Sequence, residues 1–142
     1  MNRAIKFRAW LNYEQKYVIP VAIYFAENIE PTKIDYIEDG ELKSAISGQF
    51  ELEQDTGLKD KNSKKIYEGD IVGIKWNYYR IAFDGKYGWF GLSEIPMQDK
   101  VAFSDTCQIM PYLKDNSGEV IGNIHESTEL LGGTNVTNIK NN

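Results

Sequence analysis

The sequence has almost none of the residues that build disulfide scaffolds, metal centres or catalytic relays. Its 142 residues include one cysteine, Cys107, and one histidine, His125. A single thiol cannot close an internal disulfide, and a single imidazole leaves no zinc ligand cluster and no histidine-based triad. Phosphate-binding glycine loops and the GxSxG pattern are absent as well. We therefore expect no catalytic residue, no metal site, no cofactor and no enzymatic activity.

Long apolar runs are also missing. The N-terminal segment carries Arg3, Lys6 and Arg8 without the apolar stretch of a secretory signal. No window approaches the roughly 18 apolar residues of a membrane span. We expect no membrane segment and a cytoplasmic location, where a single free thiol stays reduced.

Neither sign of charge is in large excess, but the charges are unevenly distributed. The formal net charge is −5. Residues 1–26 carry 4 basic and 1 acidic side chains and residues 58–92 carry 7 and 4, whereas 27–57 carry 2 and 9 and 93–142 carry 3 and 7. An acidic total opposes sequence-independent binding to a phosphate backbone. The alternating blocks are either solvated faces or complementary patches that bring copies or partners together.

Aromatic residues, in contrast, are plentiful. The chain has 9 tyrosines, 6 phenylalanines and 3 tryptophans, and such side chains are enriched in packed β-sheets. Length and composition together predict a mainly β protein with one domain over residues 1–131. The polar, asparagine-rich segment 132–142 has little to bury and is predicted to be a mobile tail.

Alternation of apolar and polar residues predicts short strands in the first part of the chain. These strands cover residues 5–10, 17–25, 34–37, 42–46 and 50–55. Trp10 falls on the outward side of the first strand, Pro20 should interrupt the second, and Asp39-Gly40 should form a hairpin turn. The carboxylates at positions 51, 53 and 55 are expected on a solvated outer face.

The remaining strands are short and closely spaced, which favours a small barrel. After a loop over 59–65, Gly69-Asp70 should form a tight turn that feeds a strand. Strands are predicted near 72–76, 79–83, 89–92, 101–103, 107–110 and 120–124. Tyr79, Ile81 and Phe83 are expected to share one face of their strand, and the loop after Asp84 is expected to be longer than two residues. Ser127 is a candidate cap for one helical turn.

Three stretches carry a family resemblance. They are IKFRAW at 5–10, DTGLKDKNSKKIYEGDIV at 55–72 and VIGNIHESTELL at 120–131. Together they resemble the YopX family of small, uncharacterised phage and prophage proteins. The resemblance implies a mainly β, YopX-like fold with an SH3-like barrel element, additional short strands and at most one or two short helical turns. It also implies the cytoplasm of a bacterial host, homo-oligomers and no enzymatic activity, and it supplies no functional residues to carry over.

The candidate interaction residues have exposed, cationic or aromatic side chains. The loop lysines with a nearby aromatic ring are candidates for contact with a phosphate backbone, and they are Lys59, Lys61, Lys64, Lys65 and Tyr67. Tyr78 and Arg80 point outward by alternation and could join an aromatic binding surface. An outward Trp10 must be covered, either by a second copy or by its own chain.

Two functional hypotheses follow from these residues. The first is a non-enzymatic β domain that self-associates and binds an unidentified host or phage protein. The alternative is a nucleic-acid-binding accessory protein that uses the 59–65 lysines and nearby aromatics, which the acidic net charge disfavours. A hydrolase or nuclease would require several carboxylates converging in one concave pocket.

Overall fold

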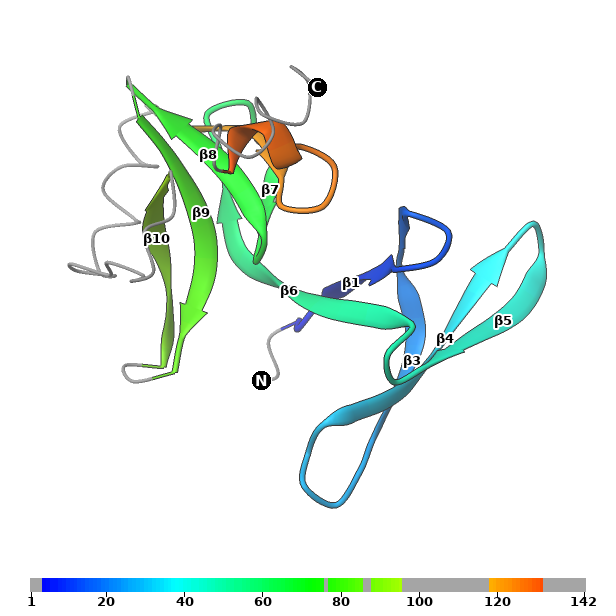
Figure 1. Cartoon of the computed structure of the whole chain (residues 1–142). Coiled ribbons are helices and arrows are strands. Elements are labelled where there is room, and N and C mark those ends of the chain that lie inside the picture. The colour runs from blue at the N-terminus through cyan, green and yellow to red at the C-terminus, as the bar shows by residue number, and fades with distance from the viewer. Residues whose placement is uncertain (1–3, 76, 86–87, 96–117, 132–142) are drawn as a thin grey trace, which may run out of the picture. The chain divides into compact units, whose positions relative to one another are not determined.

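The computed structural model describes residues 4–75, 77–85, 88–95 and 118–131 (Figure 1). The chain forms two compact units, over residues 1–55 and 56–142. Strands dominate both units, and helical structure within the described residues is limited to one 3₁₀ turn at Thr128–Leu130. The mainly β fold predicted from the sequence is therefore confirmed. Whether both units act as one domain over 1–131 stays a prediction.

The first unit contains five strands and the beginning of a sixth. They are β1 (Phe7–Leu11), β2 (Lys16–Val18), β3 (Pro20–Phe25), β4 (Pro31–Glu38), β5 (Glu41–Ile46) and β6 (Phe50–Lys59). β1 lies between β2 and the first half of β6, and β4 lies between β3 and β5. All of these pairs are antiparallel. The predicted break near Pro20 is confirmed, because β2 ends before Ile19 and β3 begins at Pro20.

The β4–β5 hairpin has the turn that its sequence predicts. Glu38 pairs with Glu41, which leaves Asp39 and Gly40 as a two-residue loop. Both loop residues have positive φ, 53° and 79°, as the tight hairpin turn that matches strand twist requires. Figure 1 shows β4 and β5 side by side along this hairpin.

The core of the first unit lies on one face of the β3–β4–β5 sheet. Ile34 and Ala45 are cross-strand partners, and both are buried with Tyr36. The same cluster contains Ala9, Leu11 and Phe50, with Val18, Ile23 and Leu52 packed against it. Since neighbouring side chains on a strand point to opposite faces, Ile37, Leu42 and Ile46 lie on the other face.

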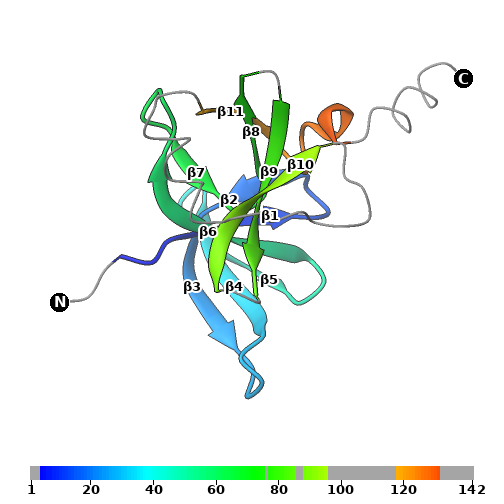
Figure 2. The same cartoon turned by 90° about the vertical axis from the view of Figure 1, so that its left-hand side faces the viewer.

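The second unit starts within β6 and contains five further strands. They are β7 (Lys65–Tyr67), β8 (Asp70–Ile74), β9 (Asn77–Asp84), β10 (Trp89–Ile95) and β11 (Gly118–Asn123). β7 pairs with β6, and the other four form a sheet in the order β10–β9–β8–β11, which Figure 2 shows with β8, β9 and β10 side by side. The sheet curls into a half-barrel. This agrees with the barrel-like element expected from the sequence.

The core of the second unit fills the inside of the curled sheet. Ile66, Val72, Ile74 and Ile81 are buried there. Leu58, Tyr79, Phe90, Leu92 and Val120 pack against them. Phe83 shares a strand face with Tyr79 and Ile81, as predicted, since its cross-strand partner Phe90 packs against this core, but Phe83 itself is 47% exposed. It lies near the end of β9, where its main ring contact is with Phe90, at 5.3 Å between ring centroids.

Several local predictions in the second unit can be compared directly with the structure. β9 and β10 are joined by four residues, Gly85 to Gly88, so the longer loop is confirmed. Gly69 has a φ of 88° and Asp70 accepts the Tyr67 N–H at 2.8 Å, which confirms the tight turn. Ser127 precedes the 3₁₀ turn but makes no side-chain capping bond. Ser127 is thus the N-cap residue of the predicted turn, but its hydroxyl accepts the Asn123 N–H at 3.3 Å instead of capping the turn.

Other sequence predictions fall outside the described residues. They concern Trp76, the strands at 101–103 and 107–110, Cys107 and the tail 132–142.

Candidate functional site

The outer face of the β3–β4–β5 sheet carries exposed apolar side chains. Ile37 and Leu42 are cross-strand partners at 54% and 63% exposure, and Ile46 is 56% exposed at the far end of β5. Val21 on β3 is 62% exposed. Apolar side chains gathered on one sheet face mark interaction surfaces, whereas scattered ones are ordinary. We call Ile37, Leu42 and Ile46 the outer apolar face.

A polar cluster lies between these apolar positions and keeps the face ordered. Asp35 accepts hydrogen bonds from the Ser44 hydroxyl at 2.6 Å and the Tyr24 hydroxyl at 2.8 Å. Lys33 Nζ lies 3.5 Å from the same carboxylate. The Ser44 bond first and the Tyr24 bond second lower the pKa of Asp35 below its ordinary value. Asp35 thus stays ionised and fixes the side chains of β3, β4 and β5 against one another.

The outer edge of β5 is open within the part of the chain that the structure describes. β5 has β4 as its neighbour on one side and no neighbour on the other. Because Glu38 and Glu41 close the hairpin, ladder alternation directs the backbone groups of Leu42 and Ser44 away from β4. The Gln49 side chain accepts the N–H of Ile46 at 3.0 Å and so closes one end of the edge. Exposed strand edges of this kind are templates for further strand pairing.

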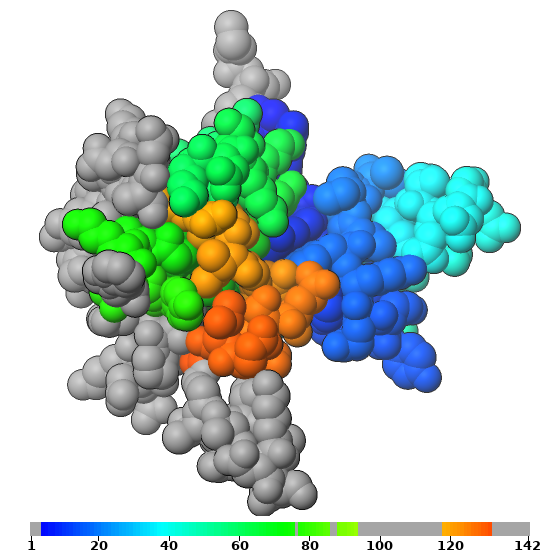
Figure 3. Space-filling model, turned by 90° about the horizontal axis from the view of Figure 1, so that it is seen from above, coloured from blue at the N-terminus to red at the C-terminus, as the bar shows by residue number. Residues whose placement is uncertain are grey.

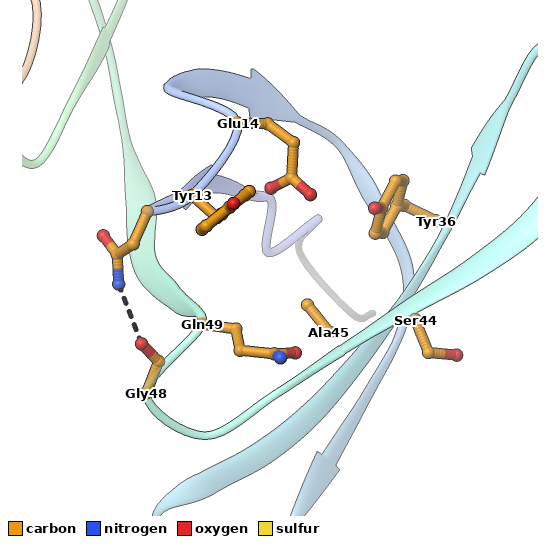
Figure 4. Close-up of a pocket in the computed structure, with 8 residues that line it drawn as sticks. Tyr13, Glu14, Tyr36, Ser44, Ala45, Gly48 and Gln49 are labelled. Atoms are coloured by element: carbon orange, nitrogen blue, oxygen red, sulfur yellow. Dashed lines mark hydrogen bonds between the residues drawn. The ribbon is translucent and has the colours of Figure 1, made fainter.

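A pocket of about 490 Å³ opens on the core side of β4 and β5. It is lined by Asn12, Tyr13, Glu14, Tyr36, Ser44, Ala45, Gly48 and Gln49. Figure 4 shows Tyr13, Glu14, Tyr36 and Gln49 arranged around its opening. Asn12 connects the turn after β1 to the turn after β5. Its side-chain amide donates to the Gly48 carbonyl at 3.1 Å, and its backbone N–H donates to the Gln49 carbonyl at 3.0 Å.

A chain of ion pairs lies on the same unit. Glu38 accepts hydrogen bonds from the ammonium groups of Lys16 and Lys43, the latter at 2.8 Å. These contacts, Lys16 first, lower the pKa of Glu38 to about 2. In return, the Glu38 bond raises the pKa of both lysines. Both cations are therefore engaged by Glu38.

The lysine loop, residues 59–65, is a surface hairpin loop as predicted. Lys59, Lys61, Lys64 and Lys65 are all exposed. Lys61 pairs with Glu119 on β11 at 3.4 Å, and the Asn62 amide donates to the same carboxylate at 3.1 Å. Figure 3 shows the surfaces of the loop and of β11 next to each other. Glu119 therefore offsets part of the positive charge that the sequence placed here.

Sequence reasoning missed Asp60, which builds this loop. Asp60 is 7% exposed, and its carboxylate accepts the N–H groups of Asn62 at 2.8 Å, Lys64 at 2.9 Å and Val120 at 2.9 Å. Burial by itself raises the pKa of Asp60, but the three backbone donors outweigh it, so the pKa lies below its ordinary value. The available sequence signal was an aspartate in a polar loop, because aspartate side chains commonly accept the backbone N–H two residues further along the chain.

The other predicted interaction residues have mixed exposure. Tyr78 is 44% exposed on β9, whereas Arg80 and Tyr67 are half-buried. The cross-strand partners of Arg80 are Ile71 on β8 and Ser93 on β10. Both partners are buried, at 0% and 1% exposure, so Arg80 lies among buried neighbours and not on an open surface. Only Tyr78 of this group offers the open ring that an aromatic platform needs.

The predictions of an outward Trp10 and a solvated Glu53 are wrong. Trp10 is 3% exposed and contacts Tyr17 edge-to-face at 4.9 Å. Glu53 is 5% exposed and accepts bonds from Arg8 Nε at 2.8 Å and the Tyr17 hydroxyl at 3.0 Å. The Arg8 guanidinium in turn lies 4.1 Å from the centre of the Tyr17 ring. Tyr17 on β2 covers this face of β1. Packing within the chain therefore explains why Trp10 is buried.

The described residues contain neither a metal-binding cluster nor a membrane-spanning helix. No three histidine, cysteine, aspartate or glutamate side chains gather there so as to hold a metal ion. Of the same residues, none forms a helix with the length and apolarity to cross a membrane.

Comparison with known proteins shows similarity to one protein family and to solved structures. The family described as YopX protein matches residues 6–132. The crystal structure of protein EF1440 from Enterococcus faecalis is similar with a TM-score of 0.58 and 28% identity. That match covers 90% of this chain and 98% of the Enterococcus chain. No curated protein is significantly similar.

Proposed function

The chain belongs to the YopX family, and on that premise we propose that it is a non-enzymatic interaction domain that self-associates through the outer edge of β5. The observation that carries the proposal is the outer apolar face beside an open strand edge, with Leu42 at 63% exposure. Strand addition at such an edge supplies main-chain hydrogen bonds, and alternate side chains supply specificity. In the phage setting that the resemblance implies, the assembled form would bind a host or phage protein.

The sequence of β5 supports a second copy of the chain as the partner. An antiparallel pair of β5 strands centred on Ser44 joins the free N–H and carbonyl of each Ser44 to those of its counterpart. This register places Leu42 of one copy opposite Ile46 of the other on the same face, so two apolar pairs form by symmetry. The exposed Gln49 side chain moves off Ile46 to complete the ladder.

The magnitude of the effect can be estimated from one side chain. Burying the exposed part of one Leu42 side chain contributes on the order of 1 kcal/mol to the free energy of dimerisation. The symmetric dimer buries two copies of Leu42, so the contribution doubles. Leu42→Lys also places two ammonium groups near the interface. We expect the dimer dissociation constant to rise at least about 30-fold.

Sedimentation velocity at protein concentrations from about 10 to 200 μM is the test. The matched control is Ile29→Lys, which makes the same charge change at a position that is 79% exposed in the turn before β4. The wild type and Ile29→Lys should dimerise alike, and Leu42→Lys should be monomeric. A wild type that is monomeric at the highest concentration, or a Leu42→Lys variant that dimerises normally, contradicts the proposal.

The lysine loop gives the less favoured alternative, binding of single-stranded nucleic acid. Four exposed lysines support it, whereas the Lys61–Glu119 ion pair and the net charge of −5 weigh against it. Salt-sensitive anisotropy of a labelled single-stranded oligonucleotide, with a shallower salt dependence in Lys61→Ala, would favour this alternative, and no anisotropy change at about 50 mM salt would exclude it.

A further inference from the structure

Pairing of two β5 strands joins apolar side chains that a single chain keeps apart. Within one copy Ile37 lies beside Leu42, whereas Ile46 lies at the other end of β5, beyond Ser44. The pair centred on Ser44 places Ile46 of the second copy on the far side of Leu42. Side chains directly opposite each other in such a pair lie about 5 Å apart. Each dimer therefore carries two apolar triads, each made of Ile37 and Leu42 of one copy and Ile46 of the other.

Strand pairing extends the sheet but does not cover its outer face. Ile37, Leu42 and Ile46 are each more than half exposed in the single chain. Because side chains project from the faces of a sheet and strands pair through their edges, pairing buries only the flanks that Leu42 and Ile46 turn toward each other. Apolar side chains that remain gathered on an exposed surface mark a site for a further partner.

The charge of this sheet indicates the kind of partner. Residues 20–47 carry six acidic and two basic side chains. Both lysines are engaged, Lys33 with Asp35 at 3.5 Å and Lys43 with Glu38 at 2.8 Å. The turns at the two ends of the sheet hold carboxylates that form no ion pair with the described residues, and these are Glu27, Glu30 and Asp39. The sheet therefore attracts a positively charged partner.

The same charge disfavours a second dimer as the cover of the triads. Stacking two dimers face to face brings two acidic sheets together, and like charges across an interface oppose association. A helix is the other element that packs on the face of a sheet. β4 has eight residues and spans about 26 Å, which is the length of a helix of about 18 residues.

We propose that each apolar triad binds the apolar face of a basic amphipathic helix presented by a partner protein. Basic residues beside the apolar stripe of the helix then lie near the carboxylates at the ends of the sheet. The inference rests on the proposed function, because a single copy brings only Ile37 and Leu42 of each triad together. Helix binding and dimerisation are therefore coupled, and each strengthens the other by the same factor.

Two model helices of about 18 residues provide the probe. Both carry leucine on one face, and the polar face is lysine in the first and glutamate in the second. At about 50 mM salt, anisotropy of the labelled peptides should show the lysine helix binding at least about 10-fold more tightly than the glutamate helix. Equal binding of both peptides, or dimers that stack into tetramers in sedimentation velocity, overturns the proposal.

Ile37→Ser connects the binding to the triad. Ile37 lies on β4, away from the paired edge, so this variant should dimerise normally but bind the lysine helix about 5-fold more weakly. The matched control, Ile5→Ser, removes a side chain that is 55% exposed before β1 and should change nothing. An unchanged affinity in Ile37→Ser means that the lysine helix is held by charge alone and refutes the triad.

The proposed function and this inference fail in different ways. A wild type that dimerises but does not bind the lysine helix overturns the inference and leaves self-association intact. A wild type that stays monomeric with and without the helix overturns both. Leu42→Lys should lose dimerisation and helix binding together, and a monomeric Leu42→Lys that binds the helix as tightly as the wild type contradicts the coupling.

Discussion

Asp60→Ala removes the carboxylate that holds the lysine loop to β11. In the wild type this side chain is 7% exposed and accepts three backbone N–H groups at 2.8 to 2.9 Å. Hydrogen bonds to a charged group each contribute about 1.5–3 kcal/mol, offset by the cost of burying the charge. In the variant, water can replace the carboxylate at the N–H groups of Asn62 and Lys64, because both residues are exposed. The Val120 N–H lies within β11 and loses its acceptor. We expect a net loss of about 3 kcal/mol.

Asp60→Asn removes the negative charge of this side chain while keeping nearly the same size and shape. The amide oxygen can still accept from Asn62 and Lys64, but its NH₂ group then faces the Val120 N–H, donor against donor. We expect a loss of about 2 kcal/mol. The matched control is Glu129→Ala, an exposed carboxylate in the 3₁₀ turn that makes no bond to the described residues. It should cost less than about 0.5 kcal/mol.

Urea unfolding measures these differences. With a slope of about 2 kcal/mol per molar urea, the midpoint should fall by about 1.5 M for Asp60→Ala and about 1 M for Asp60→Asn. Hydrogen exchange at the Val120 amide should accelerate in both variants. The pKa of Asp60 is lowered in the fold, so its stabilisation is present above the unfolded pKa near 3.9. It is lost as the pH falls through the folded pKa. A midpoint within about 0.3 M of wild type in Asp60→Ala would refute this reasoning.

Two further predictions concern the sheet ends. An added Cβ at Gly122 would lie 2.1 Å from the Ser127 hydroxyl and 2.7 Å from its Cβ, so Gly122→Ala should destabilise by about 2 kcal/mol in thermal unfolding. Gly122→Ala combined with Ser127→Gly should recover most of this loss, and an additive double variant would contradict the clash. The Glu38 carboxyl should titrate by NMR near its pKa of about 2, and its pKa should rise in Lys43→Met. Its stabilisation is present above the unfolded pKa near 4.3 and is lost as the pH falls through about 2.

Local patterns in the sequence predicted most of the strands and turns. Alternation located β1, the start of β6 and β8, because a strand with one buried face repeats every two residues. Asp39-Gly40 predicted its hairpin turn, because few other dipeptides accept positive φ at both positions. The family resemblance was confirmed by the match over residues 6–132.

Local sequence patterns predicted much less of the candidate sites. The pocket brings Glu14 from one turn together with Tyr36 from β4 and Gln49 from another turn. These residues are far apart in the chain, and none of them forms a motif. The outer apolar face could have been inferred from Leu42 and Ile46 only after Ile34 and Ala45 were known to face the core.

The sequence by itself determined the β class, the positions of the chain reversals and the exposed lysine loop, since each depends on neighbouring residues alone. The tertiary structure decided which faces are covered. Trp10 and Glu53 are buried because Tyr17 lies across them, and Asp60 is buried because β11 returns to its loop. Burial is a property of segments distant in the chain that pack together, and alternation along one strand carries no information about what lies above it.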